Sequence, residues 1–217
     1  MGRLLIIDAF GAIVALVIWY YLLVRYNHRK GAAALHAVET ACLGKGRVIE
    51  ARWLDPCRLQ ARLCFATHLL DNARVTIRLF HRPMPVHWLI SLWRKQKETV
   101  TLEADLDYVP GFQLEVFRHR WVTHKNAAAS SKSKDWTISR PGPIVLTTKT
   151  QWTQELTPVV NTLITSRGQD LLVVRFRNQS PHLVAVVGLD ALSDEQGAAT
   201  FLGVVRDLAA GASTSHQ

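Results

Sequence analysis

The longest apolar run of the chain is Leu4–Val24, near the N-terminus, and its only formal charge is Asp8. A helix of about 21 residues rises about 31 Å, close to the ~30 Å hydrocarbon thickness of a bilayer. The run is longer than the apolar core of a signal peptide, and no small-x-small cleavage motif follows it. We therefore expect a transmembrane helix here, and the rest of the chain is too polar to supply another.

Downstream of this run, apolar and polar residues alternate with period two, which is typical of half-buried strands. We expect strands at Arg47–Leu54, Arg58–Phe65, Arg74–Phe80, Thr99–Leu106 and from Phe112 to about Arg120. The last two flank the turn Val109-Pro110-Gly111 and predict a hairpin.

The C-terminal third predicts a second hairpin and a closing helix. The apolar runs Leu171–Phe176 and Leu183–Leu189 flank a polar turn and read as a buried hairpin. Ser193-x-x-Gln196 is a capping box that opens a helix, and Gly211 is its expected end. The fold class expected is therefore α+β, with one N-terminal transmembrane helix, a mostly antiparallel β-rich domain and a C-terminal packing helix.

Between two of the strands, Val86–Lys95 predicts a short helix. Val86, Leu89, Ile90 and Trp93 share one apolar face, Trp88 and Leu92 broaden it, and Arg94 and Lys95 close it with positive charge. Two interpretations stay open. The segment is either a crossover packed on the core, or an interfacial helix that contacts lipid headgroups or a partner.

The charge distribution predicts the orientation of the anchor. Trp19, Tyr20 and Tyr21 form an aromatic belt at its distal end, and Arg25, Arg29 and Lys30 follow, against Arg3 and the amino group at the other end. The positive-inside rule places the N-terminus outside and the large domain in the cytoplasm, at the inner (plasma) membrane. We divide the chain into a transmembrane anchor with its basic flank (1–30), a linker helix (31–46), a cytoplasmic α+β domain (47–211) and a tail (212–217).

Asp8 lies one turn inside the apolar run. Asp8 either makes a polar contact with a partner helix or forms a proton or pigment site within the membrane, or it reaches the outer headgroups.

The chain is basic, with a formal net charge of +9. The predicted strands place Arg58, Arg62, Arg74 and Arg78 on one polar face, which either binds phosphate or an acidic partner or is a solvated exterior. A polar loop at 126–135 carries Lys132 and Lys134, which can contact lipid or an acidic subunit. No aromatic-basic RNA motif is present, so nucleic acid is not an expected partner.

Recognisable catalytic motifs are missing. No P-loop, G-x-G-x-x-G, G-x-S-x-G, H-E-x-x-H or EF-hand pattern occurs, and the nine histidines have no ligand spacing. The three cysteines, Cys42, Cys57 and Cys64, form no C-x-x-C motif and argue against a disulfide framework. We expect no enzymatic activity, no cofactor and no metal site.

These features predict a non-enzymatic accessory subunit of a larger integral-membrane complex, which inserts one helix and covers the cytoplasmic face with a basic domain. Its partners would be other membrane-protein subunits and anionic lipid headgroups. The alternative is a stand-alone membrane-tethered module that binds anionic lipid or a phosphorylated ligand. The residues expected to contact partners or the membrane are Asp8, Trp19, Tyr20, Tyr21, Arg25, Trp88, Leu92, Trp93, Arg94, Lys95, Lys132 and Lys134.

The layout resembles that of the H subunit of purple-bacterial photosynthetic reaction centres. The resemblance covers the anchor region, where Trp19-Tyr20-Tyr21-Leu22 and the basic stop from Arg25 to Lys30 lead into a β-rich domain. It implies that any cofactors belong to the partner subunits.

Overall fold

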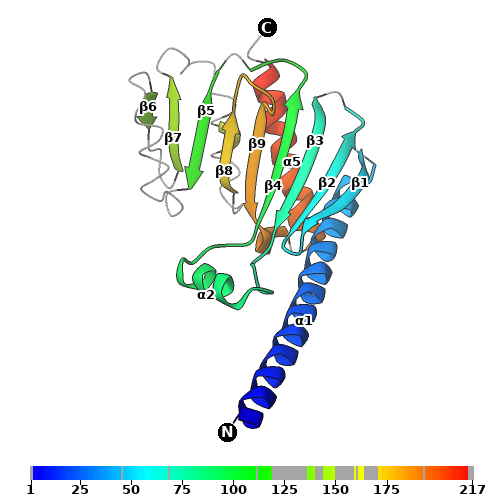
Figure 1. Cartoon of the computed structure of the whole chain (residues 1–217). Helices are drawn as coiled ribbons and strands as arrows, with labels where there is room; N and C mark the ends of the chain where they lie inside the picture. The colour runs from blue at the N-terminus through cyan, green and yellow to red at the C-terminus, as the bar shows by residue number, and fades with distance from the viewer. Residues whose placement is uncertain are drawn as a thin grey trace.

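The computed structural model describes residues 2–44, 46–67, 69–110, 112–118, 136–139, 144–149, 159, 161–163, 171–192 and 194–214. A long helix at the N-terminus leads to an antiparallel sheet, and a C-terminal helix packs on that sheet (Figure 1). The architecture is therefore the expected α+β class.

Helix α1 runs without a break from Gly2 to Cys42, so its 41 residues measure about 60 Å. Its second half packs against the sheet through buried Ala34, Ala37 and Val38, whereas the apolar side chains from residue 6 to 22 are exposed. Gly44 has a φ of +79°, a left-handed conformation that suits glycine just past a helix end. The residues expected to form a linker helix are thus the last turns of α1, followed directly by a strand.

The described strands form one sheet in the order β1-β2-β3-β4-β9-β8-β5-β7-β6, and every pairing among them is antiparallel. Their bounds are β1 Gly46–Asp55, β2 Arg58–Phe65, β3 Leu70–Arg78, β4 Thr99–Leu106, β5 Leu114–Arg118, β6 Trp136–Ser139, β7 Ile144–Lys149, β8 Leu171–Phe176 and β9 Leu183–Gly188.

The chain-adjacent strands β8 and β9 pair as the sequence predicted, but β4 and β5 do not. Strand β9 pairs with β4, and β8 pairs with β5, so the hairpin expected across Val109-Pro110-Gly111 is wrong. The core-facing side chains of β4 and β9 are almost fully buried, as Leu102 and Ala185 illustrate, and both strands lie in the interior of the sheet. Their long-range pairing displaces the local one.

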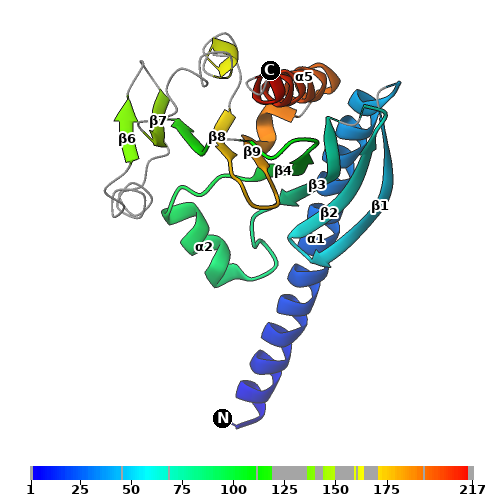
Figure 2. The ribbon, with the colours of Figure 1, turned by 90° about the horizontal axis from the view of Figure 1, so that it is seen from above.

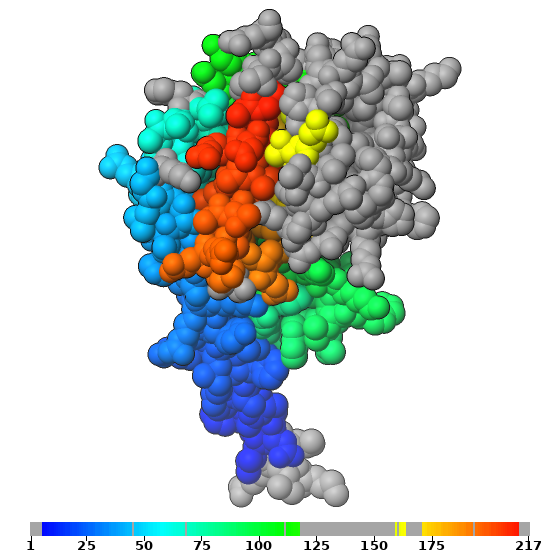
Figure 3. Space-filling model, turned by 180° about the vertical axis from the view of Figure 1, so that it is seen from behind, coloured from blue at the N-terminus to red at the C-terminus, as the bar shows by residue number. Residues whose placement is uncertain are grey.

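Helix α5, Glu195–Thr214, and the second half of α1 lie together on one face of the sheet (Figures 1 and 3). Phe201, Val205 and Leu208 of α5 join the apolar sides of the strands in the core. The helix continues through Gly211, so the expected end there is wrong. Ala212 is buried in the same core, and that packing outweighs the weak helix propensity of glycine.

Asp194 caps the start of α5, since its Oδ1 accepts a hydrogen bond from the Gly197 N–H at 3.2 Å. The predicted capping box depends on Ser193, which lies outside the described residues. The short 3-10 helix η3, Leu189–Leu192, connects β9 to this capped start.

The opposite face of the sheet, which we call the outer face, carries the polar members of the alternating strands. Seen from above, the free half of α1 and the short helix α2, Pro85–Trp93, project on the side away from α5, which is the side of the outer face (Figure 2).

Candidate functional site

Helix α1 meets the domain at a fully buried polar side chain, Asn27. Its Nδ2 donates to the carbonyl oxygens of Phe80, at 3.0 Å, and Pro56, at 3.3 Å. Its Oδ1 accepts from Arg82 Nη1 at 3.0 Å. A buried polar group is costly unless it is hydrogen-bonded, so these bonds fix both the position and the rotation of α1 on the domain.

Glu98, just before β4, is the centre of the same network. Its nearly buried carboxylate accepts from Lys30 Nζ at 2.5 Å and from Arg82 Nη1 at 2.6 Å. The backbone N–H of Phe80 donates to it at 3.1 Å. Burial by itself would raise the pKa of the Glu98 carboxyl, but the hydrogen bonds from Lys30, Phe80 and Arg82 hold it below its usual range.

Aromatic rings and one glycine complete the contact between α1 and the domain. The Arg82 guanidinium lies 5.0 Å from the centre of the Tyr26 ring, within cation–π range. His28 stacks on Trp53 of β1, with ring centres 4.2 Å apart. A Cβ on Gly31 would lie 2.6 Å from the Trp53 ring, so α1 approaches β1 this closely because residue 31 has no side chain.

We call this set of residues the junction: Tyr26, Asn27, Lys30, Gly31, Arg82 and Glu98. The sequence pointed to Lys30 as part of the basic flank, but it missed Asn27, Arg82 and Glu98. The available signal was small. Glu98 is a single acid after a run of basic residues, and Asn27 lies among other polar residues of a helical segment.

Helix α2 lies beside α1, and the ring centres of Trp19 and Trp88 are 6.0 Å apart (Figures 1 and 2). The buried residue of α2 is Ser91, a polar one. The apolar stripe predicted from the sequence is exposed instead, with Leu89 at 63% and Trp93 at 86% of their full accessibility. The core-packed interpretation of this segment is therefore wrong.

The other predicted contact residues lie along the same two helices. Asp8, Tyr20, Tyr21 and Arg25 are exposed on the free half of α1. Leu92 is exposed on α2, and Arg94 and Lys95 are exposed where that helix ends. Lys132 and Lys134 lie outside the described residues.

The outer face of β1, β2 and β3 carries the arginines that the alternation predicted. Arg62 lies directly opposite Arg74, and Arg58 directly opposite Arg78. Like charges in directly opposed positions destabilise a sheet. Arg58 is 3.8 Å from Asp55, whereas within the described part of the chain no carboxylate lies within ion-pair distance of Arg62 or Arg74.

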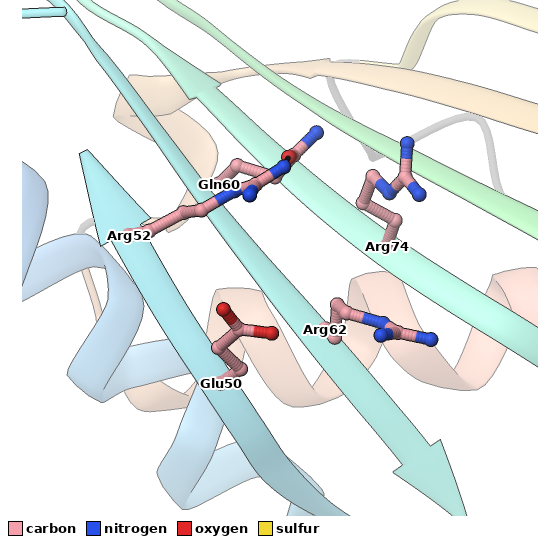
Figure 4. Close-up of a pocket in the computed structure, with 5 residues that line it drawn as sticks. All are labelled: Glu50, Arg52, Gln60, Arg62 and Arg74. Atoms are coloured by element: carbon pink, nitrogen blue, oxygen red, sulfur yellow. Dashed lines mark hydrogen bonds between the residues drawn. The ribbon is translucent and has the colours of Figure 1, made fainter. Parts of the chain in front are cut away.

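Figure 4 shows side chains from three neighbouring strands around a shallow depression of about 100 Å³ on this face. It is lined by Glu50, Arg52, Gln60, Arg62 and Arg74. Arg52 Nη2 donates to Gln60 Oε1 at 3.3 Å. We call Arg52, Arg62 and Arg74 the arginine surface. Guanidinium groups favour ligands with several negatively charged oxygens.

In the described part of the chain, the His, Cys, Asp and Glu side chains are dispersed, and two of the three cysteines are buried. No group of three or more His, Cys, Asp or Glu side chains there could hold a metal ion. Burial raises the pKa of Cys42 to about 11, and burial also raises the pKa of Cys57, so both thiols are poor nucleophiles at neutral pH.

By length and composition, α1 is the one helix in the described part of the chain that is suited to cross a membrane. A comparison of the chain with protein-family models finds no match, and a comparison with curated proteins finds none either.

Proposed function

We propose that the protein is a non-enzymatic accessory subunit of a larger integral-membrane complex. In this proposal α1 crosses the inner membrane with its N-terminus outside, and the sheet domain covers the cytoplasmic face of neighbouring subunits. A photosynthetic reaction centre is one energy-transducing complex with a subunit of this layout.

The observation that carries the proposal is the rigid junction between α1 and the domain. A module that only needs to stay near the membrane works on a flexible linker, which leaves its orientation free. Here α1 is continuous into the domain. Asn27 binds it to the backbone at Pro56 and Phe80, and Lys30 binds it to Glu98 just before β4. Such a fixed geometry is of use to a domain that must present one face to neighbours at a defined angle.

The free half of α1 supports this role, because its surface is available to other helices. Gly11 has nothing within 4 Å of the position that a Cβ would take, and Ala12 and Ala15 lie near it on the helix. Small residues let transmembrane helices approach closely. Asp8, exposed on the same half, would find a polar partner on a neighbouring helix.

The charges around the junction support the cytoplasmic orientation. Arg25 and Arg29 are exposed on α1, and the end of α2 adds Arg94 and Lys95 from a distant part of the chain. Positive side chains from two segments thus lie on the domain side of the apolar half of α1, as the positive-inside rule requires of a cytoplasmic side.

Native gel migration after mild detergent extraction tests the proposal. We expect the natural protein to migrate with other subunits as a larger assembly. A five-residue Gly-Ser insertion after Arg25, which uncouples the two halves of α1, should release it. The matched control is the same insertion after Asp107, in the turn that follows β4. A natural protein that migrates alone would contradict the subunit role.

A second candidate function, a membrane-tethered module for anionic lipid or a phosphorylated ligand, is favoured by the arginine surface. Titration of the full chain in zwitterionic nanodiscs with pyrophosphate tests it. Binding should weaken with salt and fall by about a hundredfold or more in R62Q/R74Q, because two charged hydrogen bonds of about 1.5–3 kcal/mol each are lost. Arg206→Gln, an exposed site on α5, is the matched control. Equal binding by both variants would remove this candidate.

A further inference from the structure

We propose that α2 lies in the membrane–water interface, with its apolar face at the boundary of the acyl chains. The inference deepens the proposed function and rests on it, since it requires that α1 crosses the bilayer. The occupant of the exposed face of α2 is then the lipid bilayer itself.

The orientation of α2 is the first argument. At about 100° per residue, Val86, Leu89, Ile90 and Trp93 share one side of the helix. All four are exposed, whereas Ser91 on the other side is buried. A surface helix of a protein in water normally turns its apolar stripe inward. The opposite arrangement here suits a helix whose outward side meets an apolar phase.

The height of α2 along α1 is the second argument. Trp88 of α2 lies against Trp19, and Trp19 begins the aromatic belt at the distal end of the apolar run. Tryptophan rings prefer the headgroup level of a bilayer. If Leu4–Val24 spans the hydrocarbon layer, Trp19 lies about 7.5 Å inside its end, and the contact places α2 near the boundary of acyl chains and headgroups, where interfacial helices lie.

Charge complementarity is the third argument. The chain leaves α2 through Arg94 and Lys95, both exposed, and Lys95 takes a left-handed conformation with a φ of 49° that ends the helix. Lys97, also exposed, follows. Basic side chains beside an interfacial helix are attracted to the anionic cytoplasmic leaflet and can extend their charged ends to the headgroups.

Trp88 of α2 lies against Trp19 on the exposed apolar half of α1, and this contact favours lipid over a protein partner as the occupant of the stripe. The bilayer already surrounds α1 at the height of Trp19, so it covers α2 without any further component. Two points of attachment, α1 and α2, would then fix the tilt of the domain against the membrane plane as well as its height.

Depth-dependent fluorescence quenching tests the inference on the full chain in nanodiscs that contain phosphatidylcholine and phosphatidylglycerol. Cys64→Ser removes the exposed native thiol, and the buried Cys42 and Cys57 label poorly. An environment-sensitive fluorophore is then attached at L89C. Lipids that carry a doxyl group near the headgroup should quench it by about half or more, with a blue-shifted emission.

Two matched sites make the result decisive. Tyr108→Cys, exposed two residues past the end of β4, should stay unquenched, because β4 runs away from α2 to the far end of the sheet (Figure 1). Ile13→Cys, in the middle of the apolar run, should be quenched by doxyl groups deep in the acyl chains. V86C repeats the measurement at a second site on the exposed face of α2.

The outcomes separate the two proposals. If positions 86 and 89 are as accessible to water as position 108 while position 13 is quenched, α1 crosses the bilayer and the inference about α2 is overturned. If position 13 is also unquenched, α1 does not insert, and both the inference and the proposed function fall.

Discussion

Replacement of Glu98 by glutamine should loosen the attachment of α1 to the domain. Glutamine has nearly the same shape as glutamate, so the packing around the side chain is retained. The negative charge that Lys30 and Arg82 share is lost, and an NH2 group takes the place of one of the two oxygens that face these donors. The perturbation is therefore electrostatic and confined to the junction.

The magnitude follows from the geometry of the two ion pairs. A hydrogen bond to a charged group contributes about 1.5–3 kcal/mol. The Arg82 side chain is 15% exposed and should contribute in this range, whereas Lys30 is 33% exposed and its share is reduced by solvent screening. The glutamine carbonyl keeps one acceptor. We therefore expect a loss of about 2–4 kcal/mol in the free energy of unfolding, mostly through the stranded Arg82 charge.

The loss should depend on pH. Because the native pKa of Glu98 lies below its ordinary value of 4.5, its ionised form stabilises the fold. This contribution is complete above the pKa of the unfolded chain and disappears as the pH falls through the lower native pKa. The difference between the natural protein and E98Q should thus be constant from neutral pH down to about 5 and shrink in more acidic solution.

Urea unfolding in nanodiscs, followed by tryptophan fluorescence, measures both effects, and Trp53 lies close to α1 at the junction. Glu39→Gln is the matched control, because Glu39 is exposed on the same helix and its ion pair with His36, at 4.0 Å, is weak. The reasoning fails if E98Q is no less stable than E39Q at neutral pH. It also fails if the difference between E98Q and the natural protein is the same at pH 3 as at pH 7.

Three further predictions follow from the same structure. Gly31→Ala should destabilise the domain by about 1–3 kcal/mol, because the added Cβ would collide with the Trp53 ring. Chemical denaturation measures this loss, and unchanged stability would show that the ring moves aside freely. Trp88→Ala should speed hydrogen exchange in α2 while exchange in the strands stays slow. Equal exchange rates of α2 in the natural protein and in the variant would refute a role for the Trp19 contact in holding α2. R62Q/R74Q should raise the stability of the domain by up to about 1 kcal/mol, because it removes a directly opposed pair of like charges. Thermal unfolding measures the change, and a lower stability would contradict the repulsion between the two arginines.

The sequence by itself determined the parts of this protein that rest on local periodicity. A run of 21 residues with a single charge predicts an apolar helix of bilayer length, and period-two alternation determines which side chains of a strand share a face. The strands at Arg58–Phe65 and Thr99–Leu106 were predicted with the bounds that the structure has. The arginines of the outer face followed from the same alternation.

Only the tertiary structure decided which strands are neighbours, which polar groups are buried and where an apolar stripe points. Alternation says nothing about the partner of a strand, so the pairing of β9 with β4 could not be predicted from it. Asn27 and Glu98 look like solvated residues until three separate segments meet around them. The stripe on α2 is visible in the sequence, but periodicity is the same whether the surface that it faces is a protein core or another apolar phase.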